Sequence, residues 1–155
     1  MGNCFRRLKG KKQKCRNQVI GEREFKDMNI IVVKGNICEE KIETVVSWCD
    51  CFLLNEGSYI LKQAMNEKLK AEIDKIKLSK GILTLSDCVS TCAGTLQHAH
   101  TILHATLPVW KEGSDEELER FEEVIIMCLK FAISINSFSV GFTLETADPL
   151  SIPLS

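Results

Sequence analysis

The order in which strand-like and helical segments follow one another constrains this fold most. A β-branched run at residues 29–34 predicts a strand that is buried on both faces, and residues 43–49 predict a second strand. Further strands are predicted at 85–91 and 100–106. Residues 138–144 predict the last strand, because apolar and small side chains alternate there with a period of two.

Two helices are predicted between these strands. Ser58 stands at an N-cap position after a turn, and Ser114 with Glu117 forms a capping box. Apolar residues then recur at helical spacing through residues 61–76 and 118–132. The resulting order of strand, strand, helix, strand, strand, helix, strand predicts an α/β domain with helices packed on a mixed β-sheet.

Charge is concentrated at the amino terminus. Residues 1–16 hold seven cations and no acid, whereas residues 17–155 carry a net charge of −8. The cations are Arg6, Arg7, Lys9, Lys11, Lys12, Lys14 and Arg16. We assign residues 1–25 to a disordered basic tail, 26–148 to the α/β domain and 149–155 to a carboxyl-terminal tail. A basic tail on an acidic domain indicates an anionic membrane surface as a partner.

The first residues also fit lipid attachment. Removal of Met1 exposes Gly2 to myristoylation, and Cys4 and Cys15 are candidates for palmitoylation, although Arg6 stands where the motif has Ser or Thr. One myristoyl chain gives an association constant of only ~10⁴ M⁻¹, and each nearby cation adds about 1 kcal/mol. The combination predicts a peripheral, lipid-anchored protein on the cytosolic side of the plasma membrane or an endomembrane. An uninvolved tail and a nuclear-import or nucleic-acid patch are the alternatives.

The eight cysteines do not indicate a secreted disulfide framework. Residues 3–18 lack the apolar stretch of a signal peptide, and no apolar run approaches the ~18 residues that a membrane span requires. The thiols are therefore expected to be reduced, with Cys38, Cys88 and Cys128 as small core residues.

Three histidines raise the possibility of a zinc site. A zinc ion needs three or four convergent ligands, and His98, His100 and His104 could be joined only by Cys88 or Cys92 of a neighbouring strand. Histidines at strand ends explain the same residues, so we predict no metal and no cofactor.

Four segments follow one another in the order of a known family. They are Val33-Lys34-Gly35-Asn36-Ile37, residues 43–50, Ile102 to Trp110 with its His-Ala and Pro-Val-Trp, and residues 139–142. Over residues 28–145 this order resembles the macro domain, which binds ADP-ribose and in some members hydrolyses it from proteins. It is most similar to the macro domains of large mono-ADP-ribosyltransferases.

The resemblance implies a ligand cleft at Asn36, Ile37, Asp50, Gly57 and Ser58, and the chain departs from the family in parts of this cleft. Asn36 replaces the aspartate that binds adenine, and Asp50 replaces the asparagine that orients ribose and water. The first phosphate loop keeps one glycine, and the second, at residues 143–149, has none. These departures predict a vestigial cleft with no catalytic residues, to which ADP-ribose does not bind.

Together these observations predict a non-enzymatic, lipid-anchored macro-like module that recruits an unknown protein partner. The first alternative is an ADP-ribose-binding or ADP-ribosyl-hydrolase macro domain, and the second is a basic-tailed nucleic-acid binder, with DNA not expected. The chain also ends before the final helix and strand that the resemblance implies. An exposed sheet edge, and oligomers formed through it, are therefore expected.

Overall fold

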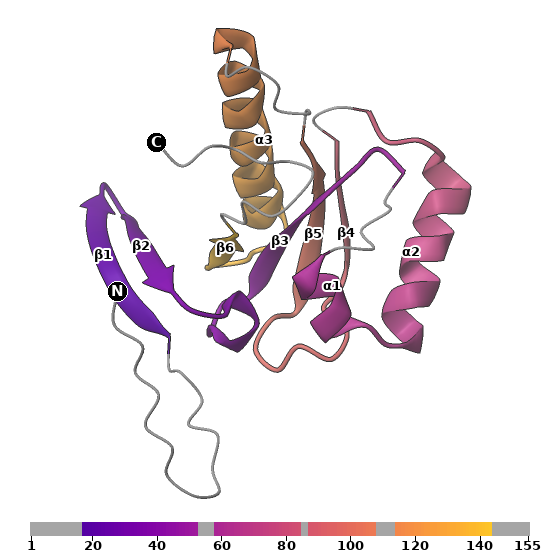
Figure 1. The fold of residues 1–155 in the computed structure, drawn as a ribbon, viewed down its shortest axis with the longest axis horizontal. Helices are drawn as coiled ribbons and strands as arrows, with labels where there is room; N and C mark the ends of the chain where they lie inside the picture. Colours follow the sequence, from indigo (N-terminus) through magenta and orange to yellow (C-terminus); the bar gives the residue numbers. More distant parts are fainter. Residues whose placement is uncertain (1–16, 53–57, 85–86, 108–113, 144–155) are drawn as a thin grey trace, which may run out of the picture. The chain divides into compact units, whose positions relative to one another are not determined.

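The computed structural model describes residues 17–52, 58–84, 87–107 and 114–143 of the chain, and Figure 1 shows its elements. The chain divides into two compact units, residues 1–36 and 37–155, and each is described by itself.

The amino-terminal unit is a β-hairpin. Strands β1 (Gln18–Phe25) and β2 (Met28–Lys34) pair antiparallel, and Lys26 takes a positive φ of 54° in the turn between them. Strand β1 lies within the range that we assigned to the tail. Strand β2 was predicted to be buried on both faces, but its side chains are largely exposed, with Ile31 at 51%. The prediction failed because a two-stranded sheet has no second layer of its own to cover either face.

The second unit contains the predicted mixed sheet. Its strands are β3 (Thr44–Cys49), β4 (Cys88–Cys92), β5 (Thr101–Thr106) and β6 (Val140–Phe142), in the order β4-β5-β3-β6. Strand β3 runs parallel to both β5 and β6, and β4 runs antiparallel to β5. The α/β class is thereby confirmed (Figure 1).

Within the described residues, four helical segments accompany this sheet: η1 (Ile37–Glu39), α1 (Tyr59–Ala64), α2 (Glu67–Lys80) and α3 (Asp115–Ser134). Both predicted N-caps form. Ser58 Oγ accepts from the backbone N–H three residues later at 3.4 Å, and Ser114 Oγ accepts from the equivalent N–H at 3.3 Å. The single helix expected at 61–76 is instead two helices. Met65 leaves the helical conformation, and Asn66 Oδ1 caps α2 by accepting from Leu69 N at 2.8 Å.

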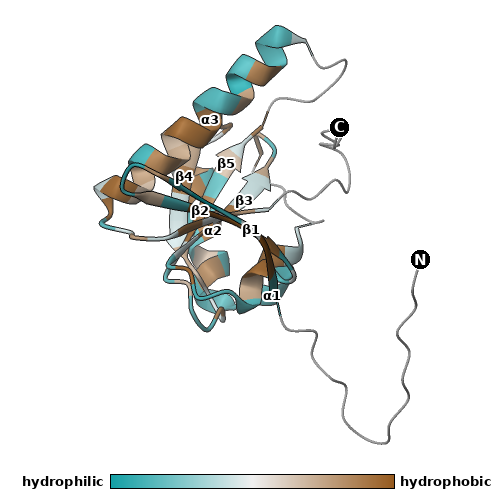
Figure 2. Cartoon of the chain, turned by 90° about the vertical axis from the view of Figure 1, so that its left-hand side faces the viewer, coloured by the Kyte–Doolittle hydropathy of each residue, from teal (hydrophilic) through white to brown (hydrophobic). Residues whose placement is uncertain are grey.

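Helices α1 and α2 cover one face of the sheet and α3 covers the other (Figure 1). The period of two along β3 and β5 sends Val45 and Ile102 toward α1 and α2, and sends Val46 and Leu103 toward α3. Burial of each such side chain contributes about 1.5–3 kcal/mol, which makes these two layers the main source of stability. The carboxyl-terminal half of α3 is hydrophobic and its amino-terminal half is hydrophilic (Figure 2).

Among the residues that the structure describes, no helix is both long enough and apolar enough to cross a bilayer.

Candidate functional site

The parallel strands end together at one edge of the sheet. Because β3, β5 and β6 run in the same direction, their carboxyl ends lie at the same edge. Residues 50–52 follow β3, Leu107 follows β5 and Thr143 follows β6. In open α/β sheets, ligands bind outside the carboxyl ends of the strands. We call these segments the carboxyl edge and take them as the candidate site.

Trp48 fixes part of this edge. Its Nε1–H donates to the backbone oxygen of Thr143 at 2.9 Å, which ties the end of β3 to the segment after β6. The indole ring lies 6.0 Å from the ring of Phe142 and 6.1 Å from that of Phe121. These contacts hold the half-buried indole in place, and with it the end of β6.

Asp50 supplies the charge of the carboxyl edge. It directly follows β3 and is exposed, and its Oδ1 accepts from Phe52 N at 2.9 Å. This short side-chain turn bends the backbone as the chain leaves the sheet. A carboxylate in this position can accept hydrogen bonds from hydroxyl groups or take a proton from water.

A network that sequence reasoning missed supports the Asp50 segment. Thr106 Oγ1, at the end of β5, donates to Thr84 O at 2.8 Å and accepts from Asp87 N at 3.0 Å. Asp87 Oδ2 in turn accepts from Thr84 N and Oγ1 at 2.6 and 2.8 Å, and the side-chain bond from Thr84 lowers the pKa of Asp87.

The residue before Thr84 is hydrogen-bonded to the segment that follows β3. Leu83 N donates to Cys51 O at 2.7 Å, directly after Asp50. The spacing of Thr84 and Asp87, which is typical of turns closed by side chains, was the available sequence signal. These bonds hold the segments that precede β4 and follow β3 in one arrangement.

Ser58, a predicted cleft residue, has its hydroxyl engaged within the fold. Its Oγ caps α1 and lies 3.1 Å from Ser47 Oγ, on a buried residue of β3. The amino end of α1 is thereby attached to the middle of β3.

Asn36 and Ile37, the other predicted cleft residues, stand where the two units meet in sequence. The backbone of Asn36 is held by the side chain of Asn17, with Nδ2 donating to Asn36 O at 2.8 Å and Oδ1 accepting from Asn36 N at 2.6 Å. These two hydrogen bonds close the open end of the hairpin. Ile37 begins η1.

The remaining predicted site residues lie outside the described part of the chain. They are Gly57, the lipidation candidates Gly2, Cys4 and Cys15, and the cations Arg6, Arg7, Lys9, Lys11, Lys12, Lys14 and Arg16.

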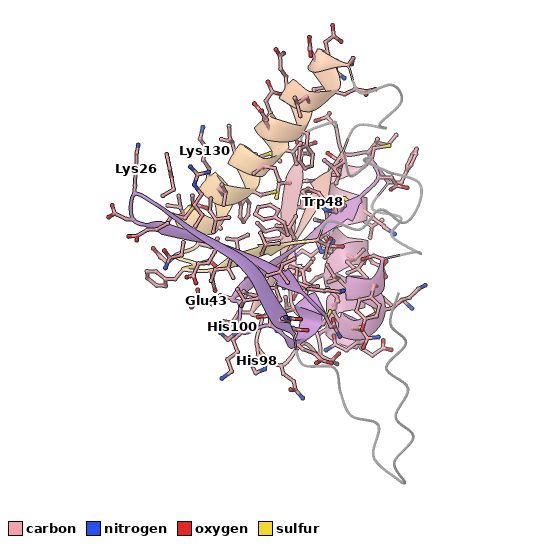
Figure 3. The ribbon with its side chains drawn as sticks, turned by 60° about the vertical axis from the view of Figure 1, so that its left-hand side comes forward. Lys26, Glu43, Trp48, His98, His100 and Lys130 are labelled. Atoms are coloured by element: carbon pink, nitrogen blue, oxygen red, sulfur yellow. The ribbon has the colours of Figure 1, made fainter. Side chains whose placement is uncertain are left out.

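The histidines do not converge on one another. His98 and His100 are exposed in the loop before β5, and His100 N donates to Glu43 O at 2.8 Å. They lie at the amino end of β3, away from Trp48 (Figure 3). His104 is buried, with Nε2 2.8 Å from Thr91 Oγ1. In the described ranges, no three His, Cys, Asp or Glu side chains are placed to hold a metal ion.

A protein-family model described as "Macro domain" matches residues 48–145. A macro domain-containing protein of Listeria monocytogenes is 30% identical over 117 residues, which cover 74% of this chain and 66% of that protein. An O-acetyl-ADP-ribose deacetylase of Salmonella typhimurium is 26% identical over 113 residues, 72% of this chain and 63% of the enzyme. The chain thus spans less than two thirds of the length of these curated relatives.

Solved macrodomains share the fold. The Oceanobacillus iheyensis macrodomain with ADP superposes with a TM-score of 0.76 at 20% identity, over 89% of this chain and 74% of that one. The same macrodomain with MES bound gives a TM-score of 0.77 at 19% identity, over 89% and 75% of the two chains.

The comparisons contradict three predictions. These are the main function of a non-enzymatic module that recruits a protein partner, the statement that the chain is not an enzyme, and the exclusion of ADP-ribose as a partner. Relatives are named as deacetylases of an ADP-ribose ester, and related structures hold ADP or ADPR. The predictions failed because they weighed substitutions in single loops, whereas the carboxyl edge is built from strand ends whose order the chain retains. Because the family model matches most of the length of this chain, the chain belongs to the macro domain family.

Proposed function

We propose that this chain binds ADP-ribose at the carboxyl edge of β3, β5 and β6. The observation that carries the proposal is the common edge of three parallel strands, which Trp48 and the Thr84–Asp87–Thr106 network hold in one arrangement. Membership of the macro domain family and the relatives described above support the choice of ligand.

Asp50 suits one part of this ligand better than another. Ribose hydroxyl groups donate hydrogen bonds that an exposed carboxylate accepts, whereas a diphosphate carries like charge and is repelled. We therefore place a ribose, and not the diphosphate, beside Asp50.

Isothermal titration of the full chain with ADP-ribose tests the proposal. A dissociation constant in the range of about 1 μM to 1 mM is expected, which corresponds to roughly −8 to −4 kcal/mol. Ribose 5-phosphate and inorganic phosphate serve as comparison ligands and should bind more weakly. Saturable binding of ADP-ribose that is no tighter than that of ribose 5-phosphate would contradict the proposal, as would no binding at all.

A second candidate function is hydrolysis of an ADP-ribose ester, which the names of the Salmonella relatives favour. Asp50 is an exposed carboxylate at the carboxyl edge, so it can take the proton of a water molecule that attacks the ester carbonyl. Release of acetate from O-acetyl-ADP-ribose should fall about 10²-fold or more in Asp50→Ala. Turnover that is unchanged in this variant would remove Asp50 from the reaction.

We also propose, from the sequence, that the tail attaches the protein to the cytosolic side of a membrane through Gly2, Cys4 and the cations. Metabolic labelling with an alkyne analogue of myristate should mark the wild type and not Gly2→Ala. In cell fractionation, the wild type should be found with membranes and the same variant in the soluble fraction. Equal labelling of both proteins would remove Gly2 from this role.

A further inference from the structure

Two cysteine side chains meet between the sheet and α3. Cys88 is the first residue of β4 and pairs in register with Ala105 of β5. Ala105 packs with Cys128 of α3, and Cys88 packs against the same cluster. The side chains of Cys88 and Cys128 are hydrogen-bonded to each other. Two thiols from elements far apart in the sequence are therefore in direct contact.

This contact makes the two thiols unequal. Cys128 is fully buried, whereas Cys88 is half-buried at the start of its strand. The hydrogen bond from Cys128 lowers the pKa of Cys88, and the positive charge of Lys80 adds to the effect. The same bond, together with burial, raises the pKa of Cys128. Cys88 is thus the more accessible thiol of the pair and the one whose ionisation the contact favours, and the thiolate is the form that attacks an oxidant.

We propose that Cys88 and Cys128 form a reversible disulfide, joining β4 to α3, when the chain is exposed to hydrogen peroxide. The Cys88 thiolate attacks one peroxide oxygen, the O–O bond breaks, and a sulfenic acid and hydroxide result; the hydroxide takes a proton from solvent. Cys128 then attacks the Cys88 sulfur, the S–O bond breaks, and water leaves with the Cys128 proton. Overall, two thiols lose two hydrogens and the peroxide is reduced to two waters.

The neighbouring cysteines provide internal comparisons. Burial raises the pKa of Cys49 to about 12, so this thiol stays protonated, and it packs with Leu83 and Val89 instead of with the α3 cluster. Cys92 lies at the opposite end of β4 from Cys88 and is also half-buried. It is therefore the matched control, with the same strand and similar exposure but a place outside the Cys88–Cys128 pair.

Peptide mapping of the folded full chain tests the proposal. The reduced protein is freed of reductant, treated with hydrogen peroxide, alkylated, and digested without reductant for mass spectrometry. We expect a linked Cys88–Cys128 peptide pair, lighter by about 2 Da than the two reduced peptides together. Dithiothreitol should abolish it, and Cys88 should be oxidised severalfold faster than Cys92.

Single substitutions separate the steps. In Cys128→Ser, the Cys88 sulfenic acid should accumulate and be trapped by dimedone, whereas Cys88→Ser should leave Cys128 reduced. Cys92→Ser should form the link as the wild type does. If circular dichroism shows that Cys128→Ser is unfolded, Cys128→Ala gives the same test. The proposal is overturned if the folded wild type forms no Cys88–Cys128 link, or if Cys92 is oxidised as fast as Cys88.

Discussion

Individual side chains set the chemistry of the carboxyl edge and the pH range of the fold. Asp50 is exposed at the end of β3, whereas His104 is buried in the middle of β5. Thr91 Oγ1 donates to Cys92 O at 3.1 Å, so it accepts from His104 Nε2–H, which assigns the tautomer of the neutral ring. We propose that Asp50 contacts the ligand, whereas His104 affects stability.

Asp50→Asn should tighten ADP-ribose binding by up to about fivefold, because the amide oxygen still accepts from a ribose hydroxyl while the charge that repels the diphosphate of the same ligand is removed. Titration calorimetry measures it. Asp74→Asn, the same change on an exposed residue of α2, should leave the affinity unchanged. Weaker binding in Asp50→Asn would mean that the negative charge itself contributes to binding.

Burial lowers the pKa of His104 to about 4, from an ordinary value of 6.5. Between pH 6.5 and pH 4 the unfolded chain therefore binds a proton at this residue that the folded chain does not bind. The free energy of unfolding is not reduced by this residue above pH 6.5, and it falls as the pH is lowered toward 4. The free energy of unfolding should drop by about 2 kcal/mol between pH 7.5 and pH 5 through this residue. Urea unfolding at both pH values measures the difference.

His104→Gln should lose most of that pH dependence, since an amide can still donate to Thr91 but does not titrate in this range. His100→Gln, at an exposed position, should retain it. A wild type whose stability is flat between these pH values would contradict the assignment.

Among the secondary-structure elements, the junction of α1 and α2 shows how local sequence and packing combine. Met65 and Asn66 interrupt the helical pattern, and Thr95 N donates to Ala64 O at 2.8 Å, at the carboxyl end of α1. The turn between β4 and β5 therefore packs against the end of α1, and Gly94 is the residue that permits the approach, with a φ of 58°.

Gly94→Ala should destabilise the fold by more than 2 kcal/mol, because a Cβ there would collide with the backbone oxygen of Ala64 as well as strain a positive φ. Gly81→Ala is the matched control, since Gly81 has a similar φ of 67° but open space around its Cβ position. Its cost should be only about 1 kcal/mol. Equal losses in chemical denaturation would show that the contact with Ala64 adds nothing.

Asn66→Ala should cost about 1 kcal/mol, because Leu69 N loses the acceptor that begins α2. Ser79→Ala, which removes an exposed hydroxyl near the end of the same helix, should change stability by less than about 0.5 kcal/mol. Chemical denaturation of both variants provides the comparison.

For the chain as one molecule, ligand binding and folding are linked. If ADP-ribose binds the folded form alone, a concentration of 100 times the dissociation constant adds about 2.7 kcal/mol of stability. The melting temperature should then rise by roughly 5–10 °C. Differential scanning fluorimetry measures the shift, with ribose 5-phosphate as the control ligand. Oligomers formed through an exposed sheet edge stay a prediction. Size-exclusion chromatography with light scattering, which measures the molar mass of the protein in solution, would test it.

Local patterns in the sequence determined the α/β class, the capping residues Ser58 and Ser114, and most strands of the sheet, because period and cap chemistry are properties of neighbouring residues. They did not determine that β2 would be exposed, since a β-branched run reads the same whether or not another layer covers it. The split of the first helix and the contact of Cys88 with Cys128 likewise depend on packing. Only the tertiary structure brought the ends of β3, β5 and β6 to one edge, because strand order and direction join residues that no local pattern relates.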